Sequence, residues 1–198
     1  MLRQLCGALA EAHAIGLIHR DIKPSNVILC NRGGLHDVAK LLDFGLVRMQ
    51  STHALGAGLT QAGLIFGTPT YMSPEQATGR DLDARSDIYS LGALAYFLLT
   101  GQPPFVRDSV VQILAAHIKE PVAPLRSCRS DVHEDLEAVV LRCLAKDPEE
   151  RFPDVARVEQ ALCACRSAGD WIESDAAAWW NALSTGTESD SSQAVERV

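Results

Sequence analysis

Three short polar segments in the first half of the 198-residue chain hold the side chains that could do chemistry. Residues 19–26 contain Asp21, Lys23 and Asn26, and residues 43–45 begin with Asp43. The third segment covers residues 67–75. A loop carboxylate can orient a hydroxyl group and accept its proton, and an amide oxygen with a second carboxylate suits the hard cation Mg²⁺. An ammonium group two residues from the first carboxylate is placed to meet a phosphate group.

Together, HRDIKPSN (19–26), DFG (43–45) and GTPTYMSPE (67–75) resemble motifs of the protein kinase family. There they are the catalytic loop, the metal-binding turn and the end of the activation segment, with SPE here in place of the commoner APE. A lone DFG would occur by chance in roughly a few per cent of chains this long, whereas three ordered motifs would not. The resemblance covers about residues 1–166 and implies a Ser/Thr protein kinase of bacterial type, since Lys23 is typical of Ser/Thr kinases.

The resemblance implies a role for each polar residue of the site. Asp21 is expected to accept the proton of a substrate hydroxyl, and Lys23 to contact the transferred phosphate. Asn26 and Asp43 are expected to bind Mg²⁺ and, with it, ATP. Three consecutive residues are expected to receive the substrate residue that follows the target hydroxyl: Gly67, Thr68 and Pro69.

Arg20 carries a regulatory expectation. Its guanidinium could pair with a phosphate on the long Gly-, Ser- and Thr-rich loop 50–67 and order that loop. The candidate acceptors are Ser51, Thr52 and Thr60, of which Thr60 lies nearest the usual place. The alternative, in which Arg20 bonds only backbone carbonyls, stays open.

Five further residues are expected to have structural roles, again by resemblance. His19 and Phe44 should stack in the core, and Asp87 should hold the backbone of the catalytic loop. Glu75 should form a buried ion pair with Arg151. Loss of either partner of such a pair leaves a buried charge unpaired, at a cost of about 3–5 kcal/mol.

The elements expected around these segments are mainly helical. Apolar spacing predicts helices over residues 2–15, 83–100, 108–119, 133–145 and 154–166, with Gly16 closing the first. Apolar runs at 27–29 and 39–42, separated by a turn at 31–34, predict a small β-hairpin. The resemblance makes this fold the helical C-lobe of a kinase, without the N-lobe β-sheet.

Three parts are predicted along the chain. Residues 1–167 form the C-lobe of a partial kinase domain, and residues 168–183 form a short helical extension. Packing of this extension on the body is the expected role of Trp171, Trp179 and Trp180. Residues 184–198 are polar and predicted to be a disordered acidic tail.

Composition excludes other classes of protein. The formal net charge of −7 argues against nucleic acid as a partner, because phosphate backbones need a basic face. The most apolar run, residues 88–99, is too short to cross a bilayer, so no membrane segment is expected. Six scattered cysteines without a CxxC pair favour free thiols in a reducing cytoplasm.

Two functions remain open at this stage. A kinase binds ATP between two lobes, yet no Gly-rich loop and no lysine precede Lys23, so ATP binding should require an N-lobe that is encoded upstream or supplied separately. The chain is then either a fragment of a kinase that phosphorylates protein Ser/Thr hydroxyls, or a non-catalytic scaffold that docks substrates or another kinase. The intact polar set favours the kinase, and the GT…SPE segment disfavours a sugar or antibiotic phosphotransferase.

Overall fold

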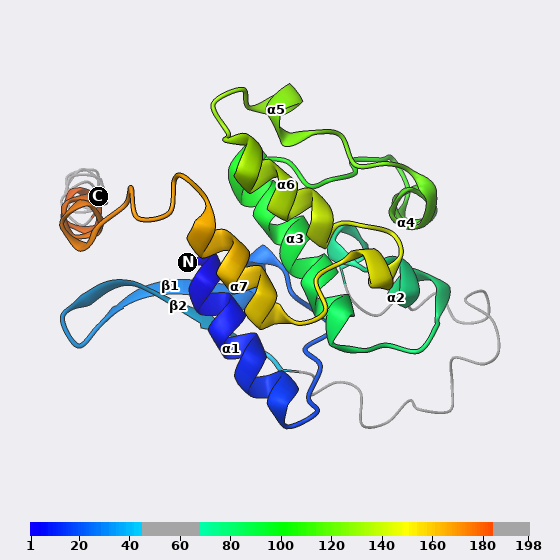
Figure 1. The fold of residues 1–198 in the computed structure, drawn as a ribbon, viewed down its shortest axis with the longest axis horizontal. Helices are drawn as coiled ribbons and strands as arrows, with labels where there is room; N and C mark the ends of the chain where they lie inside the picture. Colours follow the sequence, from blue (N-terminus) through cyan, green and yellow to red (C-terminus); the bar gives the residue numbers. More distant parts are fainter. Residues whose placement is uncertain (45–67, 184–198) are drawn as a thin grey trace, which may run out of the picture.

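A computed structural model describes residues 1–44 and 68–183 of the chain (Figure 1). Its longer elements are helices: α1 (Leu2–Ala14), α2 (Pro74–Thr78), α3 (Ala84–Thr100), α4 (Val110–Lys119), α5 (Leu125–Cys128), α6 (Glu134–Cys143) and α7 (Val155–Ala164). Short 3₁₀ helices lie between them: η1 (Pro24–Asn26), η2 (Pro69–Tyr71) and η3 (Pro148–Glu150). Within the described ranges the sheet consists of two antiparallel strands, β1 (Val27–Arg32) and β2 (Leu35–Leu41). The prediction of a mainly helical, kinase-like C-lobe with a small hairpin is confirmed.

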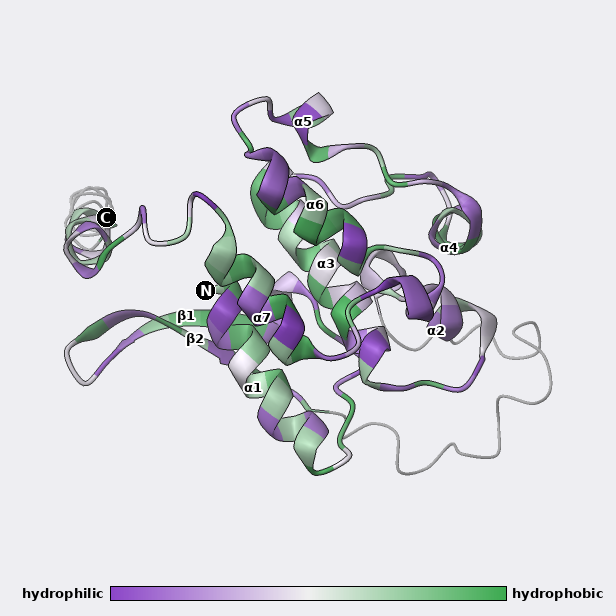
Figure 2. Ribbon diagram, in the orientation of Figure 1, coloured by the Kyte–Doolittle hydropathy of each residue, from purple (hydrophilic) through white to green (hydrophobic). Residues whose placement is uncertain are grey.

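Helix α3 runs through the middle of the helical body (Figure 1). Asp83 caps its start by accepting a hydrogen bond from the backbone N–H of Arg85, and Gly101, at φ 77°, ends it. Eleven consecutive residues of this helix are buried, so it contacts other elements on all sides rather than along one stripe. In Figure 2 α3 is mostly green and white, whereas α2 is mostly purple.

Two apolar clusters share α3. On one side Ile88 and Leu91 pack with residues of α1 and α7, and on the other Tyr89 and Tyr96 pack with residues of α5 and α6. Gly92 permits the close approach of α6, because a Cβ atom there would lie 2.7 Å from the Cβ of Cys143. The body is therefore organised around the helix that also carries Asp87.

The predicted helices all form, with boundaries a few residues inside those expected. Helix α1 ends before Gly16, whose φ of 76° suits the closing position. Helices α4, α6 and α7 correspond to the three predicted amphipathic segments. The sequence analysis did not predict α5 or η3, which are four and three residues long and too short for a period to be visible.

The hairpin is longer than predicted. The ladder pairs Val27 with Leu41 and continues to Arg32 opposite Leu35, with an irregularity between Cys30 and Arg32. The expected turn at 31–34 is reduced to Gly33 and Gly34, whose φ angles of 59° and 82° allow a two-residue connection. In Figure 1 the hairpin projects away from the helical body.

Residues 173–183 are helical and bond to the hairpin. The indole N–H groups of Trp171 and Trp180 each donate to a different carboxylate oxygen of Asp37, both at 2.7 Å. Glu173 lies 2.6 Å from the Nδ1 atom of His36. None of the described helices is both long and apolar enough to cross a membrane.

Candidate active site

Leu42 ties the segment that carries Asp43 to the catalytic loop. Its backbone N–H donates to the carbonyl of Asn26 at 2.8 Å, and its own carbonyl accepts from Nε2 of His19 at 2.8 Å. Since Nδ1 of His19 accepts the backbone N–H of Asp21 at 3.3 Å, the ring carries its proton on Nε2. No pattern in the sequence predicts this double tether, which links loop 19–26 to residue 43.

The aromatic contact expected next to this tether is present. The rings of His19 and Phe44 meet edge to face with centroids 4.7 Å apart. Asp43, between Leu42 and Phe44, has a φ angle of 58°. Few residues other than glycine adopt this region, although Asp tolerates it better than most, and such strained positions cluster at functional sites.

Asp87 on α3 holds the start of loop 19–26 through hydrogen bonds to its backbone. Its carboxylate is completely buried and accepts the backbone N–H groups of His19 and Arg20, each at 2.8 Å. The oxygen that binds His19 also accepts from Nε2 of His13 on α1, at 2.8 Å. Helix α3 therefore holds both the start of the loop and the preceding helix through one carboxylate.

The polar residues expected to do chemistry lie together on this support. The ammonium of Lys23 is 2.7 Å from the Asp21 carboxylate, whose side chain is 37% exposed. Asn26 is buried and donates its amide N–H₂ to the carbonyl of Asp21 at 2.8 Å and to Oδ2 of Asp21 at 3.2 Å. Its amide thereby fixes both the backbone and the carboxylate of Asp21.

The donor set suits a magnesium ion. Because the Asn26 nitrogen is occupied by Asp21, the amide oxygen is left for another partner, and the exposed carboxylate of Asp43 has no hydrogen-bond partner within residues 1–44 and 68–183. Mg²⁺ commonly takes only one or two oxygen ligands from a protein, while substrate phosphates and water supply the others. No cluster of three or more His, Cys, Asp or Glu side chains suited to a metal occurs among the described residues, so a complete protein cage is not formed there.

Arg20 is held by its backbone and leaves part of its side chain unpaired. Its φ angle is 69°, its N–H donates to Asp87, and its carbonyl accepts from the Gln76 side chain at 2.7 Å. Among the described residues, Nε of Arg20 is the one buried side-chain nitrogen or oxygen without a hydrogen-bond partner. Thr60, Ser51 and Thr52, the candidate phosphate acceptors, lie outside the described residues.

The third motif ends on a buried ion pair. Arg151, only 2% exposed, donates Nη1 and Nη2 to the two carboxylate oxygens of Glu75 at 2.7 and 2.8 Å. Its remaining donors bond the carbonyls of Ala145, Arg85 and Lys146, so all five guanidinium N–H groups have partners. Burial alone raises the pKa of Glu75, but the hydrogen bonds and charge of Arg151 outweigh it and hold that pKa below its ordinary value.

The part of this motif that is expected to contact the substrate is only partly described by the structure. Thr68 precedes η2 and Pro69 opens it, while Gly67 lies outside the described residues. After η2, Ser73 and Gln76 form a reciprocal capping box at the start of α2. The segment 68–76 is therefore anchored by its cap and by Glu75.

Two further groups were not among the expectations from the sequence. Ile28 follows Asn26 by two positions on β1 and is 46% exposed. His117 on α4 is fully buried and bonds the carbonyl of Thr70 at 3.0 Å. Strand alternation next to Val27 could have revealed the exposed Ile28, whereas nothing in the sequence around His117 marks it.

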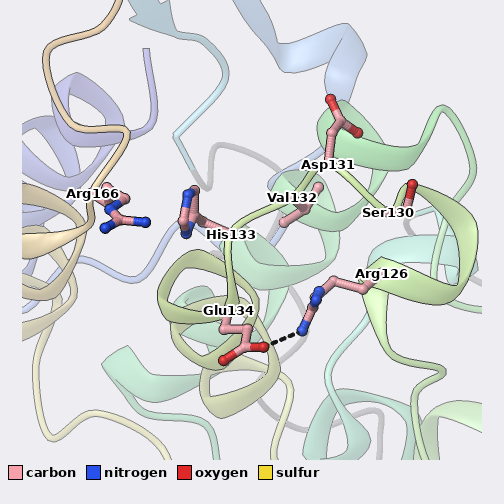
Figure 3. A pocket seen from close by; sticks show the side chains of 7 residues that line it. All are labelled: Arg126, Ser130, Asp131, Val132, His133, Glu134 and Arg166. Carbon is pink, nitrogen blue, oxygen red and sulfur yellow. Dashed lines mark hydrogen bonds and ion pairs between the residues drawn. The ribbon is translucent and has the colours of Figure 1, made fainter.

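An open pocket of about 420 Å³ lies apart from these motifs (Figure 3). Arg126 and Glu134, which line it, form an ion pair across one side. Its other lining residues are Ser130, Asp131, Val132, His133 and Arg166. None of the catalytic-loop residues contributes to it, so the pocket is separate from the chemistry described above.

Comparison with known proteins agrees with this geometry. A sequence model described as "Protein kinase domain" matches residues 1–163. Serine/threonine-protein kinase Pkn1 of Myxococcus xanthus is 45% identical over 162 residues, which are 82% of this chain and 23% of that protein. Serine/threonine-protein kinase PknB of Mycolicibacterium smegmatis is 40% identical over 162 residues, 82% of this chain and 25% of that protein.

A bundle around α3 with its polar loop tied to Asp43 defines a kinase-like C-lobe, and the matched domain covers most of the chain. The chain belongs to the protein kinase family, in its bacterial Ser/Thr branch. It spans about a quarter of the length of these curated relatives.

Proposed function

We propose that the protein containing this chain transfers the γ-phosphoryl group of ATP to serine or threonine hydroxyls of other proteins. The observation that carries the proposal is the shared placement of Asp21, Lys23, Asn26 and Asp43 around one tethered loop. A scaffold would have no use for two exposed carboxylates and a free amide oxygen at one place.

Asp21 is proposed to orient the acceptor hydroxyl and take its proton. Its exposed carboxylate is fixed by Asn26, which leaves the acid group accessible without leaving it free to rotate. Lys23, now paired with Asp21, is close enough to contact the phosphoryl group during transfer. In this proposal the Lys23 ammonium lies beside the oxygens of the transferred phosphoryl group, on which negative charge collects.

Asn26 and Asp43 are proposed as the magnesium ligands. A magnesium ion held there with ATP would neutralise the charge of the phosphates. The tether through Leu42 keeps the two ligands in register, since it joins the carbonyl of Asn26 to the residue before Asp43. The nucleotide contacts from the other lobe must come from an N-lobe, upstream or separate.

Arg20 is proposed to bind an activating phosphate, and Thr60 is the candidate residue that would carry this phosphate. The unpaired, buried Nε of Arg20 supports this role, since a guanidinium satisfied by carbonyls alone would not leave it unused. Thr68 and Pro69, with Gly67, are proposed to receive the substrate residue after the target hydroxyl.

All six cysteines are free, which supports activity in the reducing cytoplasm.

The test is phosphoryl transfer by the full-length protein with ATP, Mg²⁺ and a generic Ser/Thr protein substrate. We expect phosphoserine or phosphothreonine as the product, and loss of transfer in Asp43→Asn, while Ser25→Ala, at an exposed position of loop 19–26, keeps wild-type activity. Residues 1–198 alone should show weak or no ATP binding by calorimetry. Absence of transfer by the full-length protein, or a product restricted to phosphotyrosine, would contradict the proposal.

A further inference from the structure

His117 is a buried polar residue that the mechanism above does not use. It lies on α4, with no exposed surface, and its Nε2 atom is 3.0 Å from the carbonyl oxygen of Thr70. Its Nδ1 atom is 2.9 Å from the hydroxyl of Tyr89 on α3. Because a carbonyl only accepts, Nε2 must carry the proton, and the neutral ring then accepts the Tyr89 O–H through Nδ1.

The carbonyl of Thr70 needs a partner from outside its own helix. Within η2, Tyr71 donates to the carbonyl of Thr68 and Met72 donates to that of Pro69. A three-residue 3₁₀ helix has no further N–H to offer Thr70, and a partly buried carbonyl without a donor destabilises the fold. His117 supplies that donor from a different element, so the position of η2 against the body depends on it.

Lys146 joins this contact to the other anchor of the same segment. Its ammonium donates to the carbonyl of His117 at 2.9 Å and lies 4.6 Å from the centre of the Phe105 ring. The carbonyl of Lys146 accepts from Nη2 of Arg151, which in turn holds Glu75. Thr70 and Glu75, five residues apart, are thus held by His117 on α4 and by Arg151, and Lys146 bonds to both of these residues.

The electrostatics of the pocket agree with a neutral, donating ring. Burial, with a smaller effect from the charge of Lys146, lowers the pKa of His117 to about 4 against the opposing effect of the bond to Thr70. Burial also lowers the pKa of Lys146 to about 8. Near neutral pH the imidazole is therefore uncharged and keeps a single proton for Thr70.

We propose that His117 is a positioning residue for the acceptor peptide: by holding the carbonyl of Thr70 it sets where Thr68 and Pro69 lie. This inference rests on the proposed function, and it assigns to α4 a part in substrate recognition. Without the donor, η2 loses its fixed place on the body, and its internal bonds from Tyr71 and Met72 open more often. Peptide binding should suffer more than the chemical step, and ATP binding should not change.

The first test compares His117→Met, which removes the donor, with His117→Gln, whose amide N–H₂ can still reach a carbonyl. In the full-length protein His117→Met should raise the KM for a peptide substrate about tenfold, the worth of one buried hydrogen bond, with kcat and the KM for ATP unchanged. His117→Gln should restore the peptide KM to within about threefold of wild type. Equal peptide KM values in all three proteins would overturn the proposal.

The second test uses residues 1–198 and needs no activity. Amide hydrogen exchange at Tyr71 and Met72 should be about tenfold faster in His117→Met than in wild type or His117→Gln. Val140→Ala, a core change on α6 with no bond to the segment, controls for general destabilisation. Equal acceleration in Val140→Ala would reduce His117 to a structural role and overturn the proposal.

The two tests also separate this inference from the proposed function. If the wild-type full-length protein transfers no phosphate, the proposed function fails and the claim about substrate fails with it. Exchange at Tyr71 and Met72 would then still decide whether His117 holds the segment.

Discussion

The carboxylates at the two ends of the segment 43–75 differ in exposure, in backbone conformation and in hydrogen bonding. Asp43 is exposed, has a strained backbone and carries no hydrogen-bond partner within the described residues, whereas Glu75 is buried and receives three hydrogen bonds from Arg151 and Ser86. A carboxylate that binds a metal ion needs oxygen lone pairs that no other group occupies. A buried carboxylate that stabilises the fold instead uses its lone pairs to accept hydrogen bonds. In exposure, a similar contrast separates Asp21, whose side chain is 37% exposed, from the fully buried Asp87.

The contrast divides the kinase motifs into two kinds. Substitution of a residue proposed to face the substrate should change the free energy of unfolding little and reduce activity strongly. Residues that support them should show the reverse, because removing one leaves buried charges or N–H groups without a partner. Substitutions at matched carboxylates therefore test the division directly.

The largest effect on stability is expected at Glu75. Glu75→Ala leaves the Arg151 guanidinium buried without its counter-charge, and the free energy of unfolding should fall by about 3–5 kcal/mol. Urea denaturation of residues 1–198 measures it. Glu149→Ala is the control, since that carboxylate is 79% exposed in its pair with Arg85 and should cost less than about 1 kcal/mol. Similar losses in the two variants would break the contrast.

Asp87 should come next. Asp87→Asn keeps one oxygen but loses the charge that accepts the N–H groups of His19 and Arg20, which should cost about 2–3 kcal/mol. Asp21→Asn, in the same loop but exposed, should cost less than about 1 kcal/mol. Amide exchange at His19 and Arg20 should accelerate only in Asp87→Asn, and protection of these amides in that variant would argue against the role of Asp87.

Stability should also depend on pH through His117. Its pKa falls from 6.5 in the unfolded chain to about 4 in the fold, so the unfolded state binds more protons in between. The free energy of unfolding should then drop as pH falls from 6.5 toward 4, by up to about 1.4 kcal/mol per unit. Tyr89 and Lys146 are the titratable groups that face the ring, and both remain protonated over this range.

His117→Gln should flatten this part of the pH profile. Glu75 has a lowered pKa, and its contribution is present above the ordinary carboxyl pKa and lost at still lower pH, as protons reach its folded-state pKa. Urea midpoints measured at several pH values separate the two groups. A wild-type profile that stays flat between pH 6.5 and 4 would contradict the burial of a neutral His117.

The smallest effect is expected at the hairpin. Asp37 has a φ angle of 55°, which Asn also tolerates, so Asp37→Asn tests the carboxylate without adding backbone strain. The change removes one of the two indole bonds, and the fluorescence of Trp171 and Trp180 should shift to the red with less than about 1 kcal/mol of lost stability. Exposed Asp170→Asn is the control and should leave the spectrum unchanged.

The sequence predicted elements and motifs well because each depends on local pattern. Helical spacing and Gly16 defined α1, and the three motifs identified the kinase C-lobe. What it could not predict depends on contacts between distant segments. The double tether of Leu42 and the bond from His117 to Thr70 each join residues whose proximity only the fold creates.

The most direct test of the central claim is a paired measurement on Asp21→Asn. In the full-length protein, phosphoryl transfer from ATP to a Ser/Thr substrate should fall about 10²–10⁴-fold, as expected for loss of a proton acceptor. In residues 1–198 the free energy of unfolding should stay within about 1 kcal/mol of wild type. Full activity in Asp21→Asn, or a loss of activity explained by unfolding, would contradict the assignment of Asp21.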